Sequence, residues 1–370
     1  MGSYYIGIMS GTSMDGIDSV LVSFDAEKMH LLGTITTDIP STLKSTLTAL
    51  CQPIPHHIQT IGETDSALGK LFAANCLALL KQHSINASDV IAIGSHGQTI
   101  YHHPNSTHPF TMQIGDPNII AARTNITTVA DFRRRDIALG GQGAPLVPAF
   151  HEYLFKRKAS DQYVVNIGGM ANITYLPSDE KKSITGFDTG PGNTLIDQWY
   201  KQCEREHEFD KNGDWARSGK LNTALLTHLL DDPYFAKTPP KSTGREHFNL
   251  NWLHQKLQSF GKKSDPVDIQ ATLTELTAKT IADSIAHTHI RLWVCGGGAY
   301  NTYLIERLQA HCSTSTVLST EAIGIAPQWI EAAAFAWLAK QTIERKPGNC
   351  QSVTGAKKAT ILGGIYPASD

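Results

Sequence analysis

The feature that most constrains this fold is a hairpin that occurs twice along the chain. In residues 4–24, two β-rich runs flank a segment of Gly, Ser and Asp at 10–18. In residues 163–176 the same design recurs, with Gly168-Gly169 at the turn. β-Branched and aromatic runs on both sides of a glycine cluster are typical of a strand, a tight turn and a second strand. We therefore expect two homologous halves, each of which begins with such a hairpin.

Alternating helical and strand patterns follow each hairpin. Residues 68–80 have helical apolar spacing, whereas residues 90–94 and 127–130 are short buried-strand candidates. In the second half we expect a strand that ends at Phe187 and a helix that begins near Thr194. The alternation indicates an α/β fold.

A further helix is expected late in the second half. Thr272 and Glu275 have the spacing of a capping box, which predicts a helix from there to about residue 286. Residues 290–295 then form the next strand candidate, followed directly by Gly296-Gly297-Gly298.

The chain has 370 residues, more than one compact core usually organises, so two domains are expected. No low-complexity linker separates the halves, and the boundary is inferred from the repeated hairpin. We expect one domain of residues 1–130 plus 348–370 and a second of residues 131–347. Each should contain a central mixed sheet, with an active-site cleft between the two domains.

Composition narrows the class of partner. The 32 basic and 34 acidic residues leave a net charge of -2, which gives no indication of a surface for nucleic acid or anionic lipid. The six cysteines are widely spaced, as expected in a reducing compartment. No apolar run approaches the roughly 18 residues of a membrane span. We expect a cytoplasmic protein that acts on a small molecule, without nucleic-acid or membrane partners.

The glycine turns suit a polyphosphate. Glycine lets the backbone approach phosphate oxygens closely, and Gly11 and Gly16 meet that need, while Thr12 and Ser13 add donors. Acidic residues of the same turn are candidates to hold Mg²⁺. These are Asp15 and Asp18. Any one turn of this kind is more often only a tight hairpin.

Three glycine clusters together favour nucleotide binding over that alternative. Gly168-Gly169 could clasp the same phosphates from the other half, and Gly296-Gly297-Gly298 could face a nucleobase. The sequence contains neither a P-loop nor a dinucleotide-binding fingerprint. Strand, glycine turn and strand, used twice, instead resemble the phosphate loops of the superfamily of actin, sugar kinases and heat-shock ATPases. That resemblance implies two actin-like, ribonuclease H-like domains that bind ATP.

Asp188 is the candidate general base. It ends a strand before the rigid turn Gly190-Pro191-Gly192, so its carboxylate should be held in a fixed position. In a water-poor site its pKa could be tuned to take a proton from an attacking oxygen. An Asp that only accepts backbone hydrogen bonds in its own turn is an equal alternative.

Further polar residues are candidates for substrate contacts. An arginine at 133, 134 or 135 could pair with a carboxylate or phosphate, although a solvated charge run is the alternative. Gln98 and Asp116 could hydrogen-bond a sugar or serve their own turns. Glu331, in an apolar helix, could touch the sugar or lie at an exposed edge. The histidines at 96, 102, 103 and 108 have irregular spacing and are interpreted as loop residues rather than metal ligands.

Four long motifs support a more specific resemblance. Residues 9–18, 140–148, 166–172 and 187–193 occur in an order that resembles the 1,6-anhydro-N-acetylmuramic acid kinase family, essentially end to end. One departure from the wider superfamily is Ser10, where an Asp is common, so metal binding passes to Asp15 or Asp18. The resemblance matches two groups of residues to the family's nucleotide site: Gly11, Thr12, Ser13, Met14, Asp15, Gly16, Ile17 and Asp18 at the phosphates, and Gly296, Gly297 and Gly298 near adenosine. Gly168 and Gly169 are added from the second hairpin.

The resemblance also implies a reaction. ATP, Mg²⁺ and water would convert 1,6-anhydro-N-acetylmuramic acid to N-acetylmuramic acid 6-phosphate and ADP in cell-wall recycling. Asp188 would deprotonate a water that attacks C1, and the freed O6 would accept the γ-phosphoryl group. The candidates for substrate contacts, taken from the residues themselves, are Gln98, Asp116, Arg133, Arg134 and Glu331. A homodimer is an expectation at the level of the family.

Two other functions stay open on the residues alone. One is a different small-molecule kinase of the same superfamily, acting on another sugar or on an acid. The other is a nucleotide-gated binding protein, in which ATP changes the conformation without phosphoryl transfer. ADP release that does not depend on the anhydro sugar would favour a different kinase. Nucleotide binding and conformational change that persist in Asp188→Asn would favour the binding protein, whereas a kinase should lose turnover.

Overall fold

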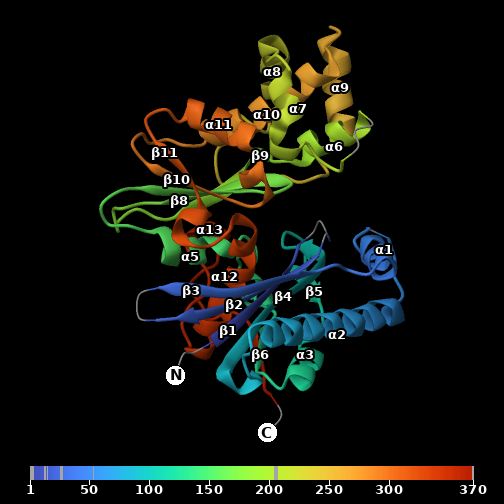
Figure 1. Ribbon diagram of the computed structural model, residues 1–370, viewed down its shortest axis with the longest axis vertical. Coiled ribbons are helices and arrows are strands. Elements are labelled where there is room, and N and C mark those ends of the chain that lie inside the picture. The colour runs from blue at the N-terminus through green and yellow to red at the C-terminus, as the bar shows by residue number, and fades with distance from the viewer. Residues whose placement is uncertain are drawn as a thin grey trace. The chain divides into compact units, whose positions relative to one another are not determined.

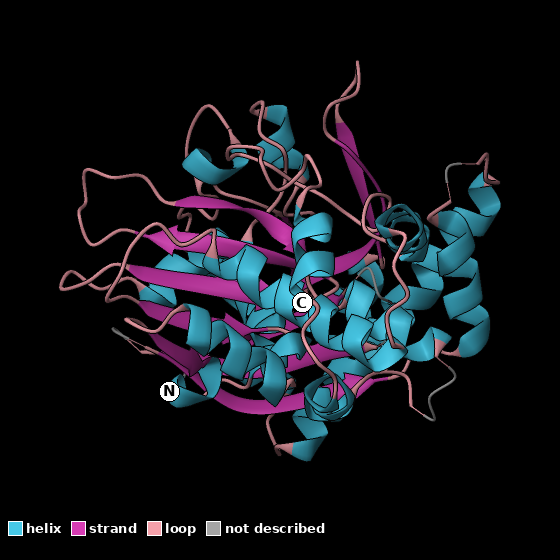
Figure 2. Cartoon of the chain, turned by 90° about the horizontal axis from the view of Figure 1, so that it is seen from above, coloured by secondary structure: helices cyan, strands magenta, loops and turns pink. Residues whose placement is uncertain are grey.

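The computed structural model describes residues 4–11, 14, 16–25, 28–52, 54–203 and 207–368. It divides into two compact units, residues 1–154 with 329–370 (unit 1) and residues 155–328 (unit 2). Each unit has one mixed β-sheet with helices packed against it, and the alternation of strands and helices can be followed in Figures 1 and 2. The expected α/β class, with two units that each contain a mixed sheet, is confirmed. The cleft expected between the domains stays a prediction.

Unit 1 contains a seven-stranded sheet in its described residues, with strand order β12-β6-β4-β1-β2-β3 and β5 paired to β4. The first three strands pair antiparallel, β4 runs parallel to β1, and β6 runs parallel to β4. The strands are β1 (Tyr4–Ser10), β2 (Ile17–Phe24), β3 (Met29–Thr37), β4 (Val90–His103), β5 (Phe110–Ile114), β6 (Thr128–Ala130) and β12 (Gly364–Tyr366).

A pair of glycines brings one helix unusually close to this sheet. Gly7 of β1 and Gly94 of β4 are register partners. A Cβ on Gly7 would collide with the carbonyl of Ala332, and one on Gly94 would collide with the carbonyl of Phe335. Both carbonyls belong to α12 (Ile330–Ile343), which is rich in buried alanine. Because the sheet and the helix both have small residues at this contact, α12 is held close to the sheet. Glu331, in the first turn of α12, is held there with it.

The opposite face of the sheet packs against α2 (Ile58–Gln82) (Figure 1). Successive strand residues point to opposite faces, so Ile6 and Ile8 face away from Gly7 and α12. They share a buried cluster with Phe72 and other apolar residues of α2. The remaining α-helices that begin in unit 1 are α1 (Ser41–Leu50), α3 (Pro117–Thr124), α4 (Arg134–Ala138), α5 (Val147–Phe155) and α13 (Gln351–Thr354).

Unit 2 repeats the design of unit 1. Its sheet has the order β11-β10-β7-β8-β9, in which β7, β8 and β9 pair antiparallel and β10 runs parallel to β7. The strands are β7 (Gln162–Ile167), β8 (Met170–Leu176), β9 (Thr185–Pro191), β10 (Arg291–Cys295) and β11 (Thr316–Ser319). The expected repetition of the hairpin is confirmed, because β1–β2 and β7–β8 occupy matching places in the two sheets.

Helices build the rest of unit 2. They are α6 (Thr194–Gln202), α7 (Asp214–Ser218), α8 (Thr223–Leu230), α9 (Leu250–Phe260), α10 (Pro266–Ala282) and α11 (Thr302–His311). Short 3-10 turns complete the two units: η1 (Ala87–Asp89), η2 (Lys211–Gly213), η3 (Gly297–Tyr300), η4 (Thr320–Ile323) and η5 (Pro327–Trp329).

The capping box expected at Thr272 and Glu275 is wrong. The helix α10 begins six residues earlier, where Asp265 is the N-cap residue and Pro266 occupies the first turn. Both Thr272 and Glu275 are buried inside the helix. The Glu275 carboxylate accepts hydrogen bonds from Arg307 at 2.6 and 3.0 Å instead of capping a helix.

The compact units differ from the expected domain bounds. Residues 131–154 and 329–347 belong with the first sheet, whereas the repeated hairpin predicted them in the second domain. For residues 329–347 the physical reason is the packing of α12 against β1 and β4, which a sequence pattern does not record. In the part of the chain that the structure describes, we find no helix with the length and apolar character that crossing a membrane takes.

Candidate active site

The first hairpin turn of unit 1 is described only in part. Thr12, Ser13 and Asp15 lie outside the described residues. The backbone N–H of Met14 donates to the carbonyl of Gly11 at 3.1 Å, which closes a turn. A Cβ on Gly16 would lie 3.0 Å from Cγ2 of Thr36, so glycine suits this close approach to β3. Ile17 is fully buried as the first residue of β2.

Asp18 is oriented by the neighbouring strand. The hydroxyl of Thr36 donates to Asp18 Oδ1 at 2.7 Å, across the paired strands β2 and β3. The charge of Asp18 also helps to raise the pKa of Glu331, so the two carboxylates interact. Mg²⁺ that is bound with phosphates takes one or two carboxylates from the protein, and the carboxylate of Asp18 is a donor of that kind.

Gln98 supports the end of β1. Ser10 and Gln98 are paired across β1 and β4, and the Ser10 hydroxyl donates to Gln98 Oε1 at 2.6 Å. Both side chains are buried, with 1% and 0% exposure. This placement favours a role in holding the first glycine turn over the predicted contact with a sugar. The Ser10 hydroxyl therefore has a hydrogen-bond partner within unit 1, whereas an Asp at this position would be a candidate metal ligand.

Arg133 is tied to two other segments of unit 1. Its Nε and Nη2 donate to His96 Nε2 at 3.0 and 2.8 Å, and its Nη1 donates to the carbonyl of Gly143 at 2.8 Å. Burial and the positive charge of Arg133 hold the pKa of His96 well below its usual range. His96 is therefore neutral and accepts from the guanidinium. This contact gives His96, one of the four histidines considered as metal ligands, a hydrogen-bond partner within the protein.

Arg133 and Glu331 are oppositely charged residues of unit 1 that affect each other's pKa. Burial lowers the pKa of Arg133 to about 10, while Glu331 and Asp136 act in the opposite direction. Burial raises the pKa of Glu331, Arg133 opposes that rise, and Asp18 adds to it. The charges of Asp18 and Arg133 therefore both act on the pKa of Glu331, although the three residues are far apart in the sequence.

Two other predicted substrate residues occupy ordinary structural positions. The Nε of Arg134 donates to Asp131 Oδ1 at 2.7 Å, and the Arg134 side chain is 65% exposed. Asp116 is the N-cap residue of α3, and its Oδ1 accepts from the backbone N–H of Asn118 at 2.8 Å. These geometries favour the alternatives of a surface charge for Arg134 and a turn residue for Asp116. The predicted contacts of both residues with the substrate stay predictions.

In unit 2, the glycine clusters converge on the start of α6. The backbone N–H of Asn193 donates to the carbonyl of Gly168 at 2.8 Å. A Cβ on Gly298 would lie 3.1 Å from Asn193 Oδ1, and a Cβ on Gly297 would lie 3.9 Å from Asn193 Nδ2. Gly296 has a φ of +79°, and a Cβ there would collide with Asn166. The turn after β7 and the turn after β10 therefore meet at the start of α6, and their contact with a nucleotide stays a prediction.

Asp188 lies in β9 and is held from a neighbouring loop. Its Oδ2 accepts from the backbone N–H of Thr243 at 3.0 Å, and its own N–H donates to the carbonyl of Lys241 at 3.1 Å. Its carbonyl accepts from the Tyr234 hydroxyl at 2.6 Å. Burial raises the pKa of Asp188 to about 6, the Thr243 N–H opposes that rise, and the charge of Glu246 adds to it. Such a carboxylate is suited to accept a proton near neutral pH.

The loop of residues 241–246 was missed by sequence reasoning. It holds Asp188, and it also places the Arg245 guanidinium beside the glycine turn, 3.4 Å from the position of a Cβ on Gly169. The available signal was the run Lys-Ser-Thr-Gly-Arg after two prolines at 239 and 240. Small, polar and basic residues after a rigid segment are suited to anion binding.

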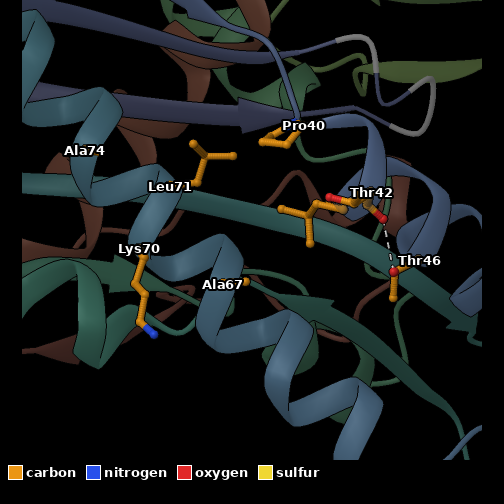
Figure 3. Close-up of a pocket in the computed structure, with 8 residues that line it drawn as sticks. Pro40, Thr42, Thr46, Ala67, Lys70, Leu71 and Ala74 are labelled. Atoms are coloured by element: carbon orange, nitrogen blue, oxygen red, sulfur yellow. Dashed lines mark hydrogen bonds between the residues drawn. The ribbon is translucent and has the colours of Figure 1, made fainter.

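Two surface hollows reach the loop of residues 241–246 at Lys241, but Asp188 lines neither of them. A cavity of about 240 Å³ lies beside β9 and is lined by Phe187, Thr189 and Lys241 among others. Asp188 is not one of its lining residues, because side chains alternate along a strand. A larger groove of about 550 Å³ lies between α1 and α2, with Leu71 and Lys70 on its wall (Figure 3). None of the predicted site residues lines that groove.

The described residues contain no cluster of three or more His, Cys, Asp or Glu side chains arranged to hold a metal ion. The histidines at 102 and 103 lie in β4, and His102 Nδ1 is 3.0 Å from the Thr111 hydroxyl in the adjacent strand. A Mg²⁺ site, if formed with ATP, would depend on Asp18 and on the predicted ligand Asp15.

A family model for anhydro-N-acetylmuramic acid kinase matches residues 3–368. The chain belongs to the anhydro-N-acetylmuramic acid kinase family. A family member of that name from Coxiella burnetii (strain Dugway 5J108-111) is 55% identical over 365 residues, which cover 98% of this chain and 97% of the relative. One from Shewanella pealeana is 51% identical over 368 residues, 99% of each chain.

Membership confirms the resemblance found in the sequence and the prediction of an ATP-dependent phosphotransferase. Among solved structures, an activator of 2-hydroxyisocaproyl-CoA dehydratase from Clostridium difficile with bound ADPNP is 12% identical, with a TM-score of 0.45 and coverage of 92% of this chain and 97% of that one. The roles of individual residues, the homodimer and the cytoplasmic location stay predictions.

Proposed function

We propose that this kinase uses ATP and water to open the 1,6-anhydro ring of 1,6-anhydro-N-acetylmuramic acid and to phosphorylate O6. The products are N-acetylmuramic acid 6-phosphate and ADP, as in the recycling of cell-wall sugars. The proposal is supported by the match to the family along residues 3–368 and by the identity of 55% to a named relative.

One observation carries the proposed chemistry: a carboxylate, Asp188, with a pKa raised to about 6 and two backbone contacts to the loop at 241–243. In the anhydro sugar, O6 is part of an ether and has no proton to lose. A base of ordinary kinase design would therefore find no hydroxyl to activate. A water molecule supplies the proton instead, and a base with this pKa is ionised at neutral pH while still able to accept it.

The atoms balance in a single reaction. Water loses a proton to Asp188, and its oxygen bonds to C1 as the C1–O6 bond breaks. The electron pair left on O6 attacks the γ-phosphorus of ATP, and the bond from that phosphorus to the β-phosphate oxygen breaks. ADP leaves with that oxygen, and Asp188 releases its proton to solvent. Most of the acceleration then comes from positioning and charge neutralisation.

Unit 1 supplies the second group of proposed contacts. Arg133 is fixed by His96 and Gly143, and its planar guanidinium suits the lactyl carboxylate of the sugar. Glu331, with its raised pKa, is suited to hydrogen-bond a sugar hydroxyl. Asp15 and Asp18 would hold Mg²⁺, which when bound neutralises phosphate charge.

The test is ADP release measured with the purified chain, ATP and Mg²⁺, with and without the anhydro sugar. Release that requires the sugar, together with a 6-phosphate product that carries one oxygen from ¹⁸O-labelled water at C1, is the expected result. Turnover that ignores the anhydro sugar but phosphorylates another sugar or an acid would favour a different kinase of the superfamily. Binding of ATP without any phosphorylated product would favour a nucleotide-gated binding protein.

A further inference from the structure

Two polar groups without partners meet at the second glycine turn. The hydroxyl of Thr194 is buried, with the residue 5% exposed, and it has no hydrogen-bond partner. It lies 2.9 Å from the position of a Cβ on Gly169. The Arg245 guanidinium lies over the same glycine, its Nη2 and Nε 3.4 and 3.6 Å from that position. A Cβ at residue 169 would crowd the Thr194 hydroxyl, whereas its distances to the guanidinium would be ordinary contacts.

Neither group is explained by the fold. A buried hydroxyl without a hydrogen-bond partner destabilises the fold, so such a group needs a compensating role. The side chain of Arg245 is exposed and makes no hydrogen bond or ion pair with any residue that the structure describes, although it carries five donors. A hydroxyl and a guanidinium beside a glycine turn form a donor set for an oxyanion.

The turn itself is rigidly attached to α6. The N–H groups of Gly192, Asn193 and Thr194 donate to the carbonyls of Gly168 and Gly169 at 2.8–3.1 Å. A Cβ on Gly192 would collide with the Gly168 carbonyl, so the turn and the helix start form one unit. Thr194 is the first residue of α6, a nine-residue helix whose positive end points to the turn.

The same loop connects this donor set to the base. Thr243 holds the Asp188 carboxylate through its N–H, and Arg245 follows two residues later. One loop therefore contacts the base in β9 and carries the arginine, and it can set the distance between the proton acceptor and a bound phosphate.

We propose that Arg245 and the Thr194 hydroxyl bind the terminal phosphoryl group of ATP at the Gly168-Gly169 turn. The exposed guanidinium turns outward to meet the phosphate, which uncovers the hydroxyl beneath it. Arg245 then neutralises the charge on the group that is transferred to O6. This inference depends on the proposed function only for the acceptor, because binding of the terminal phosphate can be measured without any sugar.

The experiment compares the dissociation constants of a non-hydrolysable ATP analogue and of ADP in the wild type and in Arg245→Ala. We expect the analogue to bind at least 10-fold more weakly and ADP to bind within 2-fold of the wild type. In sugar-dependent turnover we expect kcat to fall about 100-fold, in the range seen when a charge-stabilising donor is removed. Thr194→Val should weaken the analogue in the same selective way, and Thr194→Ser should restore its affinity.

Arg291→Gln is the matched control, because Arg291 is an exposed residue at the opposite end of β10 from its glycine turn. It should leave both affinities and kcat unchanged. If Arg245→Ala does not fold, Arg245→Lys replaces it, and its point charge should give a smaller but equally selective loss.

An unchanged ratio of analogue to ADP affinity in the folded variant would overturn the inference. So would a rise in the KM of the sugar alone, which would assign Arg245 to a substrate carboxylate. A wild type that binds the analogue through Arg245 but ignores the anhydro sugar would instead contradict the proposed function and leave this inference standing.

Discussion

The carboxylate of Asp188 accepts a hydrogen bond of 3.0 Å from the backbone N–H of Thr243. A strand residue is in this way fixed by a loop that lies 55 residues further along the chain. The contact leaves the pKa of Asp188 raised to about 6, because burial outweighs the single N–H donor. The first three predictions follow from this arrangement.

Asp188→Asn should abolish turnover without abolishing nucleotide binding. The amide keeps an oxygen that can accept from Thr243, but it cannot take a proton from water. We expect kcat to fall about 1,000-fold, within the range for general bases, while the affinity for ADP stays within 2-fold. Steady-state kinetics and calorimetric ADP titration measure the two effects. Retention of more than a tenth of the wild-type kcat would exclude Asp188 as the base.

The acid limb of the pH profile should report the same group. Asp188 must be ionised to act, so kcat/KM should rise with pH up to about 6 and level off above it. The charge of Glu246 contributes to the raised pKa, and Glu246→Gln should therefore move the midpoint to lower pH. Glu180→Gln removes an equal charge at a surface pair with Lys158 and should leave the midpoint in place. A midpoint insensitive to Glu246→Gln would contradict this account.

Stability should depend on pH through Asp188 as well. The pKa is 3.8 in an ordinary environment and about 6 in the fold, so the fold binds a proton more tightly. The stability from this group is complete below 3.8 and is lost as the pH rises through about 6. At pH 7.5, Asp188→Asn should raise the free energy of unfolding by about 1–3 kcal/mol. Urea denaturation at pH 7.5 and at pH 4.5 checks this, and the difference should shrink at the lower pH.

Gly7→Ala should destabilise unit 1 strongly. Its Cβ would meet the backbone of α12 at Ala332, which cannot yield like a flexible side chain. We expect a loss of about 3–4 kcal/mol, as for overpacking against a rigid backbone. Gly62→Ala is the control, since nothing lies within 4 Å of a Cβ at this exposed helix position. It should stabilise the protein by about 0.5–1 kcal/mol, and equal effects of the two changes would refute the packing argument.

Asp136 should be required to position Arg133. Its fully buried carboxylate accepts from the Gly143 N–H, the Asn349 amide and the Thr354 hydroxyl, each at 2.8 Å. Gly143 in turn accepts from Arg133. Asp136→Ala leaves three donors unpaired, and we expect a loss of about 3–5 kcal/mol.

A milder change isolates the effect of Asp136 on the site. Asp136→Asn should fold and raise the KM of the sugar more than that of ATP, measured in the coupled assay. Glu208→Ala, at an exposed pair with Lys201, should change stability by less than about 0.5 kcal/mol. A KM of the sugar equal to the wild-type value in folded Asp136→Asn would show that Gly143 does not position Arg133.

Local sequence patterns predicted most of the elements around the site. The hairpins at β1–β2 and β7–β8, the start of α6 at Thr194 and the strand β10 all appear where turn residues and apolar spacing placed them. The error at Thr272 has a local cause. A capping-box spacing competed with the stronger signal of Asp265 and Pro266, and burial of Glu275 against Arg307 decided the outcome.

By itself, the sequence determined the duplicated mixed sheet, the glycine turns and the family, because these depend on neighbouring residues and on their order. Only the tertiary structure decided which of these residues meet. The alignment of Gly7 with Gly94 under α12, the bond from Thr243 to Asp188 and the placement of Arg245 over Gly169 join segments distant in the chain. Such contacts are set by side-chain volume and backbone approach in three dimensions, which local periodicity does not encode.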